Sequence, residues 1–282
     1  MALCCKECQR SDKDTPVPVQ LLQVSLPGSL APEAGDSVTA VDKVYGKHSV
    51  RAVLLARPES VTRLLLGGKE SYHQDMIELA HRSGVTTEFL PWPEFRRAGE
   101  VTDDDKHQGV VALITPRPLL TEGDLDRLAG TGSAVVLALD QISDPQNLGT
   151  ILRCAAFFGV DAVLVLKNRS AEVTPLVARV AVGGAELVET FRVTNLARSL
   201  ETLKQLGFWV YGLDERGPAT LAQTEFDART VLVVGAEGEG LRRRTTEFCD
   251  ALVRIPGGRE GLESLNAGVA TAVALAEVYR GR

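Results

Sequence analysis

The sequence has few of the side chains that most often carry acid–base chemistry. Four histidines occur among 282 residues, and the last of them is His107. Histidine is the commonest general base because its ordinary pKa lies near neutrality. A catalytic site in the C-terminal part of the chain would therefore have to work without it.

Long apolar runs are also missing. No stretch approaches the ~18 consecutive apolar residues that a membrane span needs. The N-terminal sequence MALCCKECQRSDKD has no apolar core for a secretory signal, and Glu7, Asp12 and Asp14 argue against an acid-poor transit peptide. We therefore expect a cytoplasmic protein that makes no membrane contact.

Cysteine is sparse and unevenly placed. An odd, scattered set does not form a disulfide framework, and the five residues are Cys4, Cys5, Cys8, Cys154 and Cys249. Cys5 and Cys8 have the spacing of a metal-binding pair, but no second pair of ligands lies nearby in the sequence. We expect free thiols in a flexible tail and no metal site.

An excess of positive charge is absent as well. The formal net charge is −6 and the isoelectric point is about 5.4. These values argue against a broadly basic surface for nucleic acid, although a local basic patch such as Arg242 to Arg244 stays compatible with them.

What is present divides the chain into four parts. Residues 1–40 are rich in Pro, Ser and Asp and predict a flexible extension. Residues 41–116 alternate short helices and strands and predict a small α/β domain. Residues 117–130 predict a linker with a short helical turn, and residues 131–282 predict a larger domain.

The larger domain is predicted to be an α/β domain built on a mostly parallel sheet. Short Val/Leu-rich runs such as SAVVLALD, AVLVLK and TVLVVG alternate with helical segments such as NLGTILRCAAFFG and TPLVARVAVGGAE. This alternation indicates a sheet with helices on both faces. Ligands of such sheets bind beyond the carboxyl ends of the strands, where this sequence places its glycine clusters.

Three segments could carry chemistry. In LDQISDPQNLGTILR, Asn147 lies at a predicted helix start and Arg153 lies six residues later, so the two side chains do not share a helical face. The simpler alternative to a catalytic role is structural: Asn147 would cap the helix, and the stem of Arg153 would cover apolar surface. In VLVVGAEGEGLRRR, Glu237 lies inside a glycine turn, where a carboxylate would repel a pyrophosphate. The glycine spacing is not that of a dinucleotide fingerprint, which disfavours an oxidoreductase.

The third segment, VRIPGGREGLESLNAGVATAVALAE, brings Ser264 and Asn266 to the mouth of a helix of small residues. Asn266 could simply cap that helix, or the loop and helix mouth could hold a ligand. Three glycine- or turn-rich loops at strand ends indicate a pocket lined largely by backbone groups, which read an adenine-like edge well.

Taken together, the three segments resemble the SpoU/TrmH family of RNA ribose 2′-O-methyltransferases, within the SPOUT superfamily. The match rests on NLGTILR (Asn147, Gly149, Arg153), GAEGEG (Gly235, Glu237, Gly240) and IPGGREGLESLN. Residues 41–116, with VYGKHSVRAVL and HQGVVA, resemble the substrate-binding domain of the bacterial 23S rRNA guanosine 2′-O-methyltransferase branch.

The resemblance implies a fold, a cofactor and partners. The C-terminal domain would carry a deep trefoil knot, and S-adenosylmethionine would be the methyl donor. The RNA would be 23S rRNA or a ribosome assembly intermediate, with a guanosine as the target. The enzyme would be a homodimer that meets through its C-terminal domain.

The resemblance also implies roles for individual residues. The cofactor would contact the main chain at Gly235, Gly240, Ile255 and Leu265. The catalytic residues would be Arg153, Asn147, Glu237, Ser264 and Asn266. Family accounts make Arg153 the base, but a guanidinium is rarely deprotonated, so we favour Arg153 as a clamp on phosphate and the 2′-oxygen.

One departure from the family pattern leaves the substrate open. Relatives often carry a second serine where this chain has Gly268. A tRNA, an rRNA uridine or adenosine (including a resistance-type target), and a catalytically inactive RNA-binding relative are the alternatives at this point.

Overall fold

The computed structural model describes residues 42–130, 132–257 and 264–281. The predicted extension over residues 1–40, with Cys4, Cys5 and Cys8, lies outside the described residues. Within the described ranges, no helix has the length and apolar character needed to cross a bilayer. No group of three or more His, Cys, Asp or Glu side chains in the same ranges is placed to hold a metal ion.

The small domain is built on a four-stranded sheet with strand order β1-β4-β2-β3. Its strands are β1 (Asp42–Tyr45), β2 (Val61–Gly67), β3 (Thr87–Leu90) and β4 (Val110–Ile114). Strands β2 and β3 pair in parallel, and the β1–β4 and β2–β4 pairs are antiparallel. The α/β character predicted for this part of the chain is confirmed.

Helices pack on both faces of the small sheet. They are α1 (Lys47–Ala56), α2 (Gln74–Arg82) and α3 (Trp92–Gly99), with one-turn 3-10 helices η1 (Pro58–Ser60) and η2 (Glu70–Tyr72) between them. Val53 of α1 and Met76 of α2 share a buried cluster with Leu64, whereas Phe95 of α3 packs with Leu65. Successive residues of β2 therefore bury their side chains on opposite faces, as a strand requires.

The large domain is built on an eight-stranded sheet with strand order β10-β12-β9-β11-β6-β7-β8-β5, and every strand pair in it is parallel. The strands are β5 (Leu120–Thr121), β6 (Ala134–Asp140), β7 (Ala162–Leu166), β8 (Glu189–Val193), β9 (Trp209–Leu213), β10 (Ala219–Thr220), β11 (Arg229–Gly235) and β12 (Ala251–Arg254). The parallel sheet predicted from the Val/Leu-rich runs is confirmed. Residues 117–130, predicted as a linker, contain the edge strand β5 and the 3-10 helix η3 (Glu122–Leu128).

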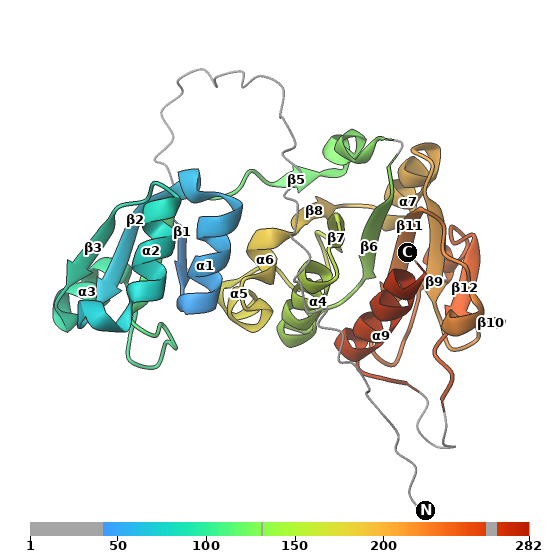
Figure 1. Ribbon diagram of the computed structural model, residues 1–282. Coiled ribbons are helices and arrows are strands. Elements are labelled where there is room, and N and C mark those ends of the chain that lie inside the picture. The colour runs from blue at the N-terminus through green and yellow to red at the C-terminus, as the bar shows by residue number, and fades with distance from the viewer. Residues whose placement is uncertain (1–41, 131, 258–263, 282) are drawn as a thin grey trace, which may run out of the picture. The chain divides into compact units, whose positions relative to one another are not determined.

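The large sheet is covered on both faces. Its helices are α4 (Pro145–Phe157), α5 (Pro175–Ala181), α6 (Gly184–Leu187), α7 (Leu196–Gln205), α8 (Arg243–Thr246) and α9 (Ala267–Arg280), with the 3-10 helix η4 (Leu221–Gln223) after β10. Residues of α4, α5 and α9 share one buried cluster with β6, and residues of α7 and η3 share the other. Figure 1 shows α4 and α9 side by side in front of the sheet.

One predicted helix is divided in two. The segment TPLVARVAVGGAE forms α5 and then α6, because Val182 and Gly183 between them have left-handed φ angles of 51° and 90°. A Cβ on Gly183 would lie 2.6 Å from the Cβ of Ala52 in α1, so only glycine fits where the break approaches α1. The helical periodicity did not reveal this break, because the residue before the glycine is an ordinary valine.

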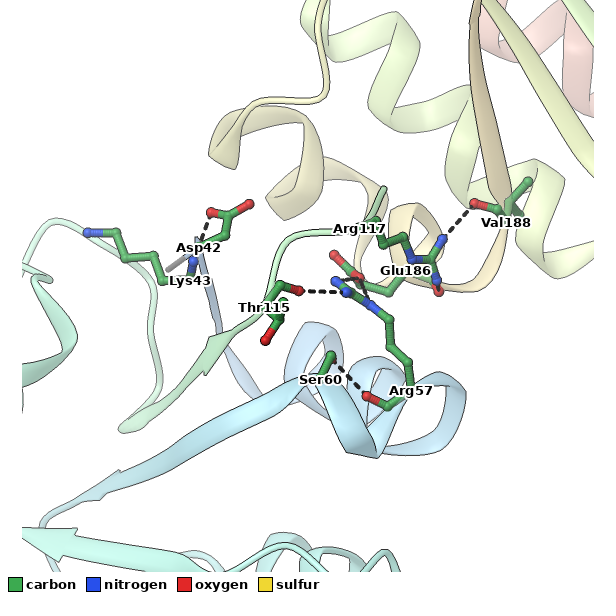
Figure 2. A network of polar contacts seen from close by, with 8 residues as sticks. All are labelled: Asp42, Lys43, Arg57, Ser60, Thr115, Arg117, Glu186 and Val188. Atoms are coloured by element: carbon green, nitrogen blue, oxygen red, sulfur yellow. Dashed lines mark hydrogen bonds and ion pairs between the residues drawn. The ribbon is translucent and has the colours of Figure 1, made fainter. Parts of the chain in front are cut away.

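A network of polar contacts surrounds Glu186 of α6 (Figure 2). Arg57 donates through Nε and Nη2 to Glu186 Oε2 at 3.1 and 2.7 Å, and through Nη1 to the carbonyl of Thr115. Arg117 donates to the backbone carbonyls of Glu186 and Val188. The Arg57 and Glu186 side chains are 12% and 11% exposed, so the pair is largely shielded from water.

Candidate functional site

The site begins at the first turn of α4. Asp144 caps this helix by accepting from the backbone N–H of Gln146, and Pro145 occupies the first helical position, where its missing N–H is not needed. Asn147 therefore lies inside the first turn, and it is 6% exposed. The alternative in which Asn147 itself caps the helix is wrong, because Asp144 takes that position and leaves the Asn147 amide free to face other elements.

A tight glycine turn after β11 presents Glu237. Ala236 and Gly240 form a β-bridge, and Gly238 and Gly240 have φ angles of 79° and 65°. A Cβ on Gly235 would lie 2.3 Å from the carbonyl carbon of Gly240, so the turn closes only around a glycine at that position. The backbone geometry of the turn therefore explains the glycines of GAEGEG.

Asn266 is the N-cap of α9, as predicted, and it also reaches across to the other two segments. Its Oδ1 accepts from the backbone N–H groups of Gly268 and Val269. Its Nδ2 donates to Asn147 Oδ1 at 2.7 Å and to Glu237 Oε1 at 2.6 Å. One amide side chain thus fixes the start of a helix and binds the two other polar residues of the site.

Glu237 is the acceptor at the centre of this cluster. Its Oε1 accepts from Asn147 Nδ2 at 3.0 Å, from Asn266 Nδ2 and from the backbone N–H of Ala267 at 3.1 Å. All of these donors are neutral, and no ion pair to Glu237 occurs within the described ranges. The start of α9 adds the positive end of a helix dipole. The carboxylate is thus held in place without a basic partner, which suits a site for a cationic ligand.

A cavity of about 700 Å³ opens beside this cluster. It lies at the carboxyl ends of β9, β11 and β12, and its lining includes Gly235, Gly240, Ile255, Ser264 and Leu265 together with Glu237. The volume is that of an ordinary small-molecule site, and four of the lining residues are glycines, which expose their backbone. A Cβ added at Gly238, Gly240 or Gly257 would meet no atom within 4 Å. The residues present therefore fit a ligand of nucleoside size.

All the predicted site residues except Arg153 fall into two groups. Asn147, Glu237 and Asn266 form one hydrogen-bonded cluster, and the predicted cofactor-binding residues line the adjoining cavity. Arg153 lies apart: it is exposed on α4, and within the described part of the chain its side chain has no hydrogen-bond or ion-pair partner. The six-residue spacing from Asn147 correctly indicated that these two side chains point in different directions.

Two glycines serve packing: Gly149 of the first motif, and Gly268, where the chain departs from the family pattern. A Cβ on Gly149 would lie 2.6 Å from the Cβ of Val180, so this glycine lets α5 approach α4. A Cβ on Gly268 would lie 2.8 Å from Cγ2 of Thr150. Thr150 thus fills the space that a larger residue at position 268 would need, and much of the small-residue character of α9 serves contact with α4 inside one chain.

Two carboxylate–arginine pairs near the site were not predicted. Asp140, fully buried at the end of β6, accepts from Arg242 Nε at 2.7 Å and from the Arg242 backbone N–H at 3.1 Å. Arg242 is therefore committed to a structural contact, while Arg243 and Arg244 stay exposed. Asp214, at the end of β9, pairs with Arg216. An acidic residue at the carboxyl end of a buried strand was the available signal in both cases.

Comparison with known proteins connects this geometry to a family. The SpoU rRNA Methylase family model matches residues 134–276, and the model for RNA 2′-O ribose methyltransferase substrate binding matches residues 43–120. The 23S rRNA (guanosine-2′-O-)-methyltransferase RlmB of Pasteurella multocida is 41% identical over 245 residues, which cover 86% of this chain and 98% of that protein. RlmB of Escherichia coli is 38% identical over 243 residues, which cover 86% and 99%.

Solved structures show the same fold. The SpoU methyltransferase AviRb from Streptomyces viridochromogenes, crystallised with AdoMet, superposes with a TM-score of 0.68 at 24% identity over 85% of this chain and 89% of that chain. A putative RNA methyltransferase of the TrmH family from Porphyromonas gingivalis gives a TM-score of 0.62 at 26% identity over 85% and 90%.

Proposed function

The chain belongs to the SpoU rRNA methylase family, and from that premise we propose that it transfers a methyl group from S-adenosylmethionine to the ribose 2′-hydroxyl of a guanosine in 23S rRNA, in the cytoplasm. The choice of RNA and nucleotide follows the RlmB proteins, which match this chain across both of its domains. The observation that carries the activity is the uncompensated Glu237 carboxylate at the rim of a backbone-lined cavity.

S-adenosylmethionine supplies a methyl group on a positively charged sulfur. The reaction forms one O–C bond as one S–C bond breaks, S-adenosylhomocysteine leaves, and the proton of the 2′-hydroxyl passes to water. Within this chain, the main chain at Gly235, Gly240, Ile255 and Leu265 would hold the adenosine. Glu237 would attract the cationic end of the donor. Asn147, Asn266 and Ser264 would orient the ribose, and positioning of this kind supplies much of the rate of such a transfer.

We assign Arg153 to the RNA. Its guanidinium is exposed and has no partner in the described part of the chain, so it is free to contact a phosphate and the 2′-oxygen, where it would stabilise the developing negative charge. If Arg153→Lys kept near-normal turnover across pH, a planar clamp would be the wrong account. Loss of RNA affinity in Arg153→Ala, with cofactor affinity intact, supports the clamp.

The mapping of methylated positions tests the function directly. The RNAs to compare are rRNA and tRNA from cells of the source organism with and without the gene, and the same RNAs after incubation with purified protein and labelled S-adenosylmethionine. We expect one 2′-O-methylguanosine in 23S rRNA that disappears with the gene and returns in vitro. A methylated tRNA, uridine or adenosine would replace the proposed substrate. A protein that binds S-adenosylhomocysteine but methylates none of these RNAs would be an inactive relative.

We also propose a homodimer that meets through the large domain. Phe157 on α4 is 83% exposed, and the neighbouring α9 carries three exposed apolar side chains, Val269, Val273 and Tyr279. Phe157 and Arg153 are four residues apart, so they share one face of α4. A second copy on this face would shield the apolar side chains and place its own surface next to Arg153. Sedimentation of Val273→Glu should show a monomer where the unmodified chain shows a dimer.

We propose that the small domain binds the RNA substrate. Three of its basic residues are partly exposed and pair with exposed carboxylates: Lys43 with Glu100, Lys47 with Asp75 and Arg96 with Asp103. Arg51 and Arg97 are exposed. Exposed pairs contribute little to stability and can be exchanged for phosphate. Affinity for rRNA fragments should therefore fall steeply with salt, and an affinity insensitive to salt would contradict this mode of binding.

The trefoil knot implied by the family resemblance is likewise a proposal. It is supported by the parallel order β12-β9-β11-β6 and by the packing of α9 against α4, which places the end of the chain beside the first helix of the large domain.

A further inference from the structure

The charges that line the cavity are uneven. Four carboxylates line it, and they are Asp214, Glu215, Glu237 and Glu239. Arg216 is the one basic side chain among the lining residues in the described ranges. A cavity with this composition attracts a cation. A role in binding the cation therefore does not explain why an arginine lines the same cavity.

Arg216 is held in a fixed orientation by Asp214. The Asp214 side chain is 3% exposed, and Oδ1 accepts from the Arg216 backbone N–H at 2.9 Å and from Nε at 2.8 Å, while Oδ2 accepts from Nη2 at 2.7 Å. Planar two-point contacts of this kind orient a guanidinium far better than a single charge contact does. The Arg216 side chain itself remains 71% exposed. Arg216 is therefore a preoriented cation at an open wall of the cavity.

Half of the guanidinium remains available. An arginine has five N–H donors, and its planar group can present one pair of donors through Nε and Nη2 and another through Nη1 and Nη2. Asp214 uses the first pair. Nη1 has no partner among the residues that the structure describes. The second pair therefore matches a carboxylate supplied by a ligand.

The position of Arg216 suits the amino-acid tail of the proposed donor. Arg216 follows β9, and Glu237 follows β11, which is the neighbouring strand of the sheet. Neighbouring strands lie ~5 Å apart. In S-adenosylmethionine the carboxylate carbon is four bonds from the sulfur, a comparable span when the tail is extended. A sulfonium near Glu237 would thus allow the carboxylate to reach the Arg216 side of the cavity.

We propose that Arg216, oriented by Asp214, binds the methionine carboxylate of S-adenosylmethionine and selects ligands that carry it. The proposal rests on the proposed function and names a contact within the same site. Arg216 binds the ligand, and Asp214 is a positioning residue that acts through it. The only anionic group of the donor thereby meets the single basic side chain of the described cavity wall.

Calorimetry with matched ligands tests the assignment. The ligands are S-adenosylmethionine, its decarboxylated analogue and 5′-methylthioadenosine, which lacks the amino-acid tail. The full-length chain should prefer S-adenosylmethionine to the decarboxylated ligand by about 10- to 100-fold, the range expected for charge-assisted hydrogen bonds. Arg216→Gln should remove most of this preference and leave the affinity for 5′-methylthioadenosine within twofold. Arg216→Lys, which keeps the charge and loses the planar fork, should fall between.

Three further variants complete the test. Asp214→Asn should reduce the preference less than Arg216→Gln does. Arg243→Gln, a matched change at an exposed arginine that pairs with Glu247, should leave all three affinities unchanged. Arg259, which lies outside the described residues, provides a competing arginine. If Arg259→Gln removes the preference and Arg216→Gln does not, the assignment is wrong.

Two other outcomes separate the possible failures. If Arg216→Gln weakens all three ligands equally, Arg216 contacts the nucleoside or shapes the cavity, and the carboxylate assignment fails while the proposed function stands. If the unmodified chain binds none of the S-adenosyl ligands, the proposed function fails first. Thermal melting of each variant confirms that it is folded before its affinities are compared.

Discussion

Glu186 and Glu237 are two glutamates held by several donors each, and they differ in what those donors carry. Glu186 is 9% exposed and pairs with the Arg57 guanidinium, so its charge is neutralised. Glu237 accepts from the side-chain amides of Asn147 and Asn266 and from one backbone N–H, all of which are neutral. The first arrangement joins two parts of the fold, and the second leaves a negative charge facing a cavity. The charge of the donors, more than their number, separates a carboxylate neutralised within the fold from one that keeps its charge beside a cavity.

Removal of Glu237 should have the largest effect. Glu237→Ala deletes the acceptor of three hydrogen bonds and the charge together, and we expect kcat/KM to fall about 1,000-fold, or ~4 kcal/mol. Glu237→Gln retains an oxygen acceptor and loses only the charge. It should weaken the binding of S-adenosylmethionine by about tenfold and that of S-adenosylhomocysteine, which lacks the sulfonium charge, much less.

A matched control for this prediction lies in the same turn. Glu239 also lines the cavity, and no hydrogen bond or ion pair involving it occurs in the described ranges. Glu239→Gln should change both affinities by less than twofold. If both Gln variants lost the same affinity for S-adenosylmethionine, the binding would depend on the total charge of the cavity and not on the position of Glu237.

The opposite behaviour is expected at Glu186. Arg57→Met leaves a buried carboxylate without its partner and should lower the free energy of unfolding by about 3 kcal/mol. The double change Arg57→Met with Glu186→Leu removes both charges and should recover most of that loss. Urea denaturation measures the stability, and calorimetry should show that the affinity for S-adenosylmethionine is unchanged. A double variant no more stable than Arg57→Met would contradict the role of an unpaired charge.

The difference between these two glutamates could be predicted only in part. The parallel sheet and the converging loops follow from the Val/Leu runs and the glycine turns, and Asn266 as a helix cap follows from its position before the Ala-rich segment. Asn147 was expected at the helix start, yet Asp144 caps the helix. That detail matters because it leaves the Asn147 amide available for Glu237.

Other features depend on residues far apart in the sequence. Arg242 meets Asp140 across 102 positions, and Arg57 meets Glu186 across 129. No local sequence pattern predicts such pairs, because tertiary packing brings the two residues together. The break between α5 and α6 is similar, since Val182 adopts a left-handed φ where the helical pattern continues. The sequence thus predicted the strands, the glycine turns and the cap of α9, and missed the cap of α4 and the contacts that decide which charges are neutralised.

A smaller effect is expected from a change in the packing of α9, the helix whose N-terminus donates to Glu237. Gly268→Ser introduces a side chain 2.8 Å from Thr150 Cγ2 and should lower the free energy of unfolding by about 2 kcal/mol, a typical cost of overpacking. Thr150→Ala in the same chain should restore part of the loss, because it removes that methyl group. A double-mutant cycle in urea measures the coupling, and additive losses would show that the two positions do not compete for space.

A third carboxylate, Asp214, has a guanidinium partner like Glu186 but lies at the cavity like Glu237. Hydrogen bonds from Arg216 hold the pKa of Asp214 below its ordinary value, against the opposing effect of burial. A lowered native pKa contributes stability at pH values above the unfolded pKa of about 3.9, and the contribution is lost as the pH falls through the native pKa. The difference in the free energy of unfolding between the unmodified chain and Asp214→Asn should therefore shrink as the pH is lowered from about 5. Because Arg216 is largely exposed, this effect should be the smallest of the four, and salt should weaken it. Urea denaturation over a pH series measures it, and a difference that grew on acidification would show that Asp214 is protonated more easily in the folded chain than in the unfolded one.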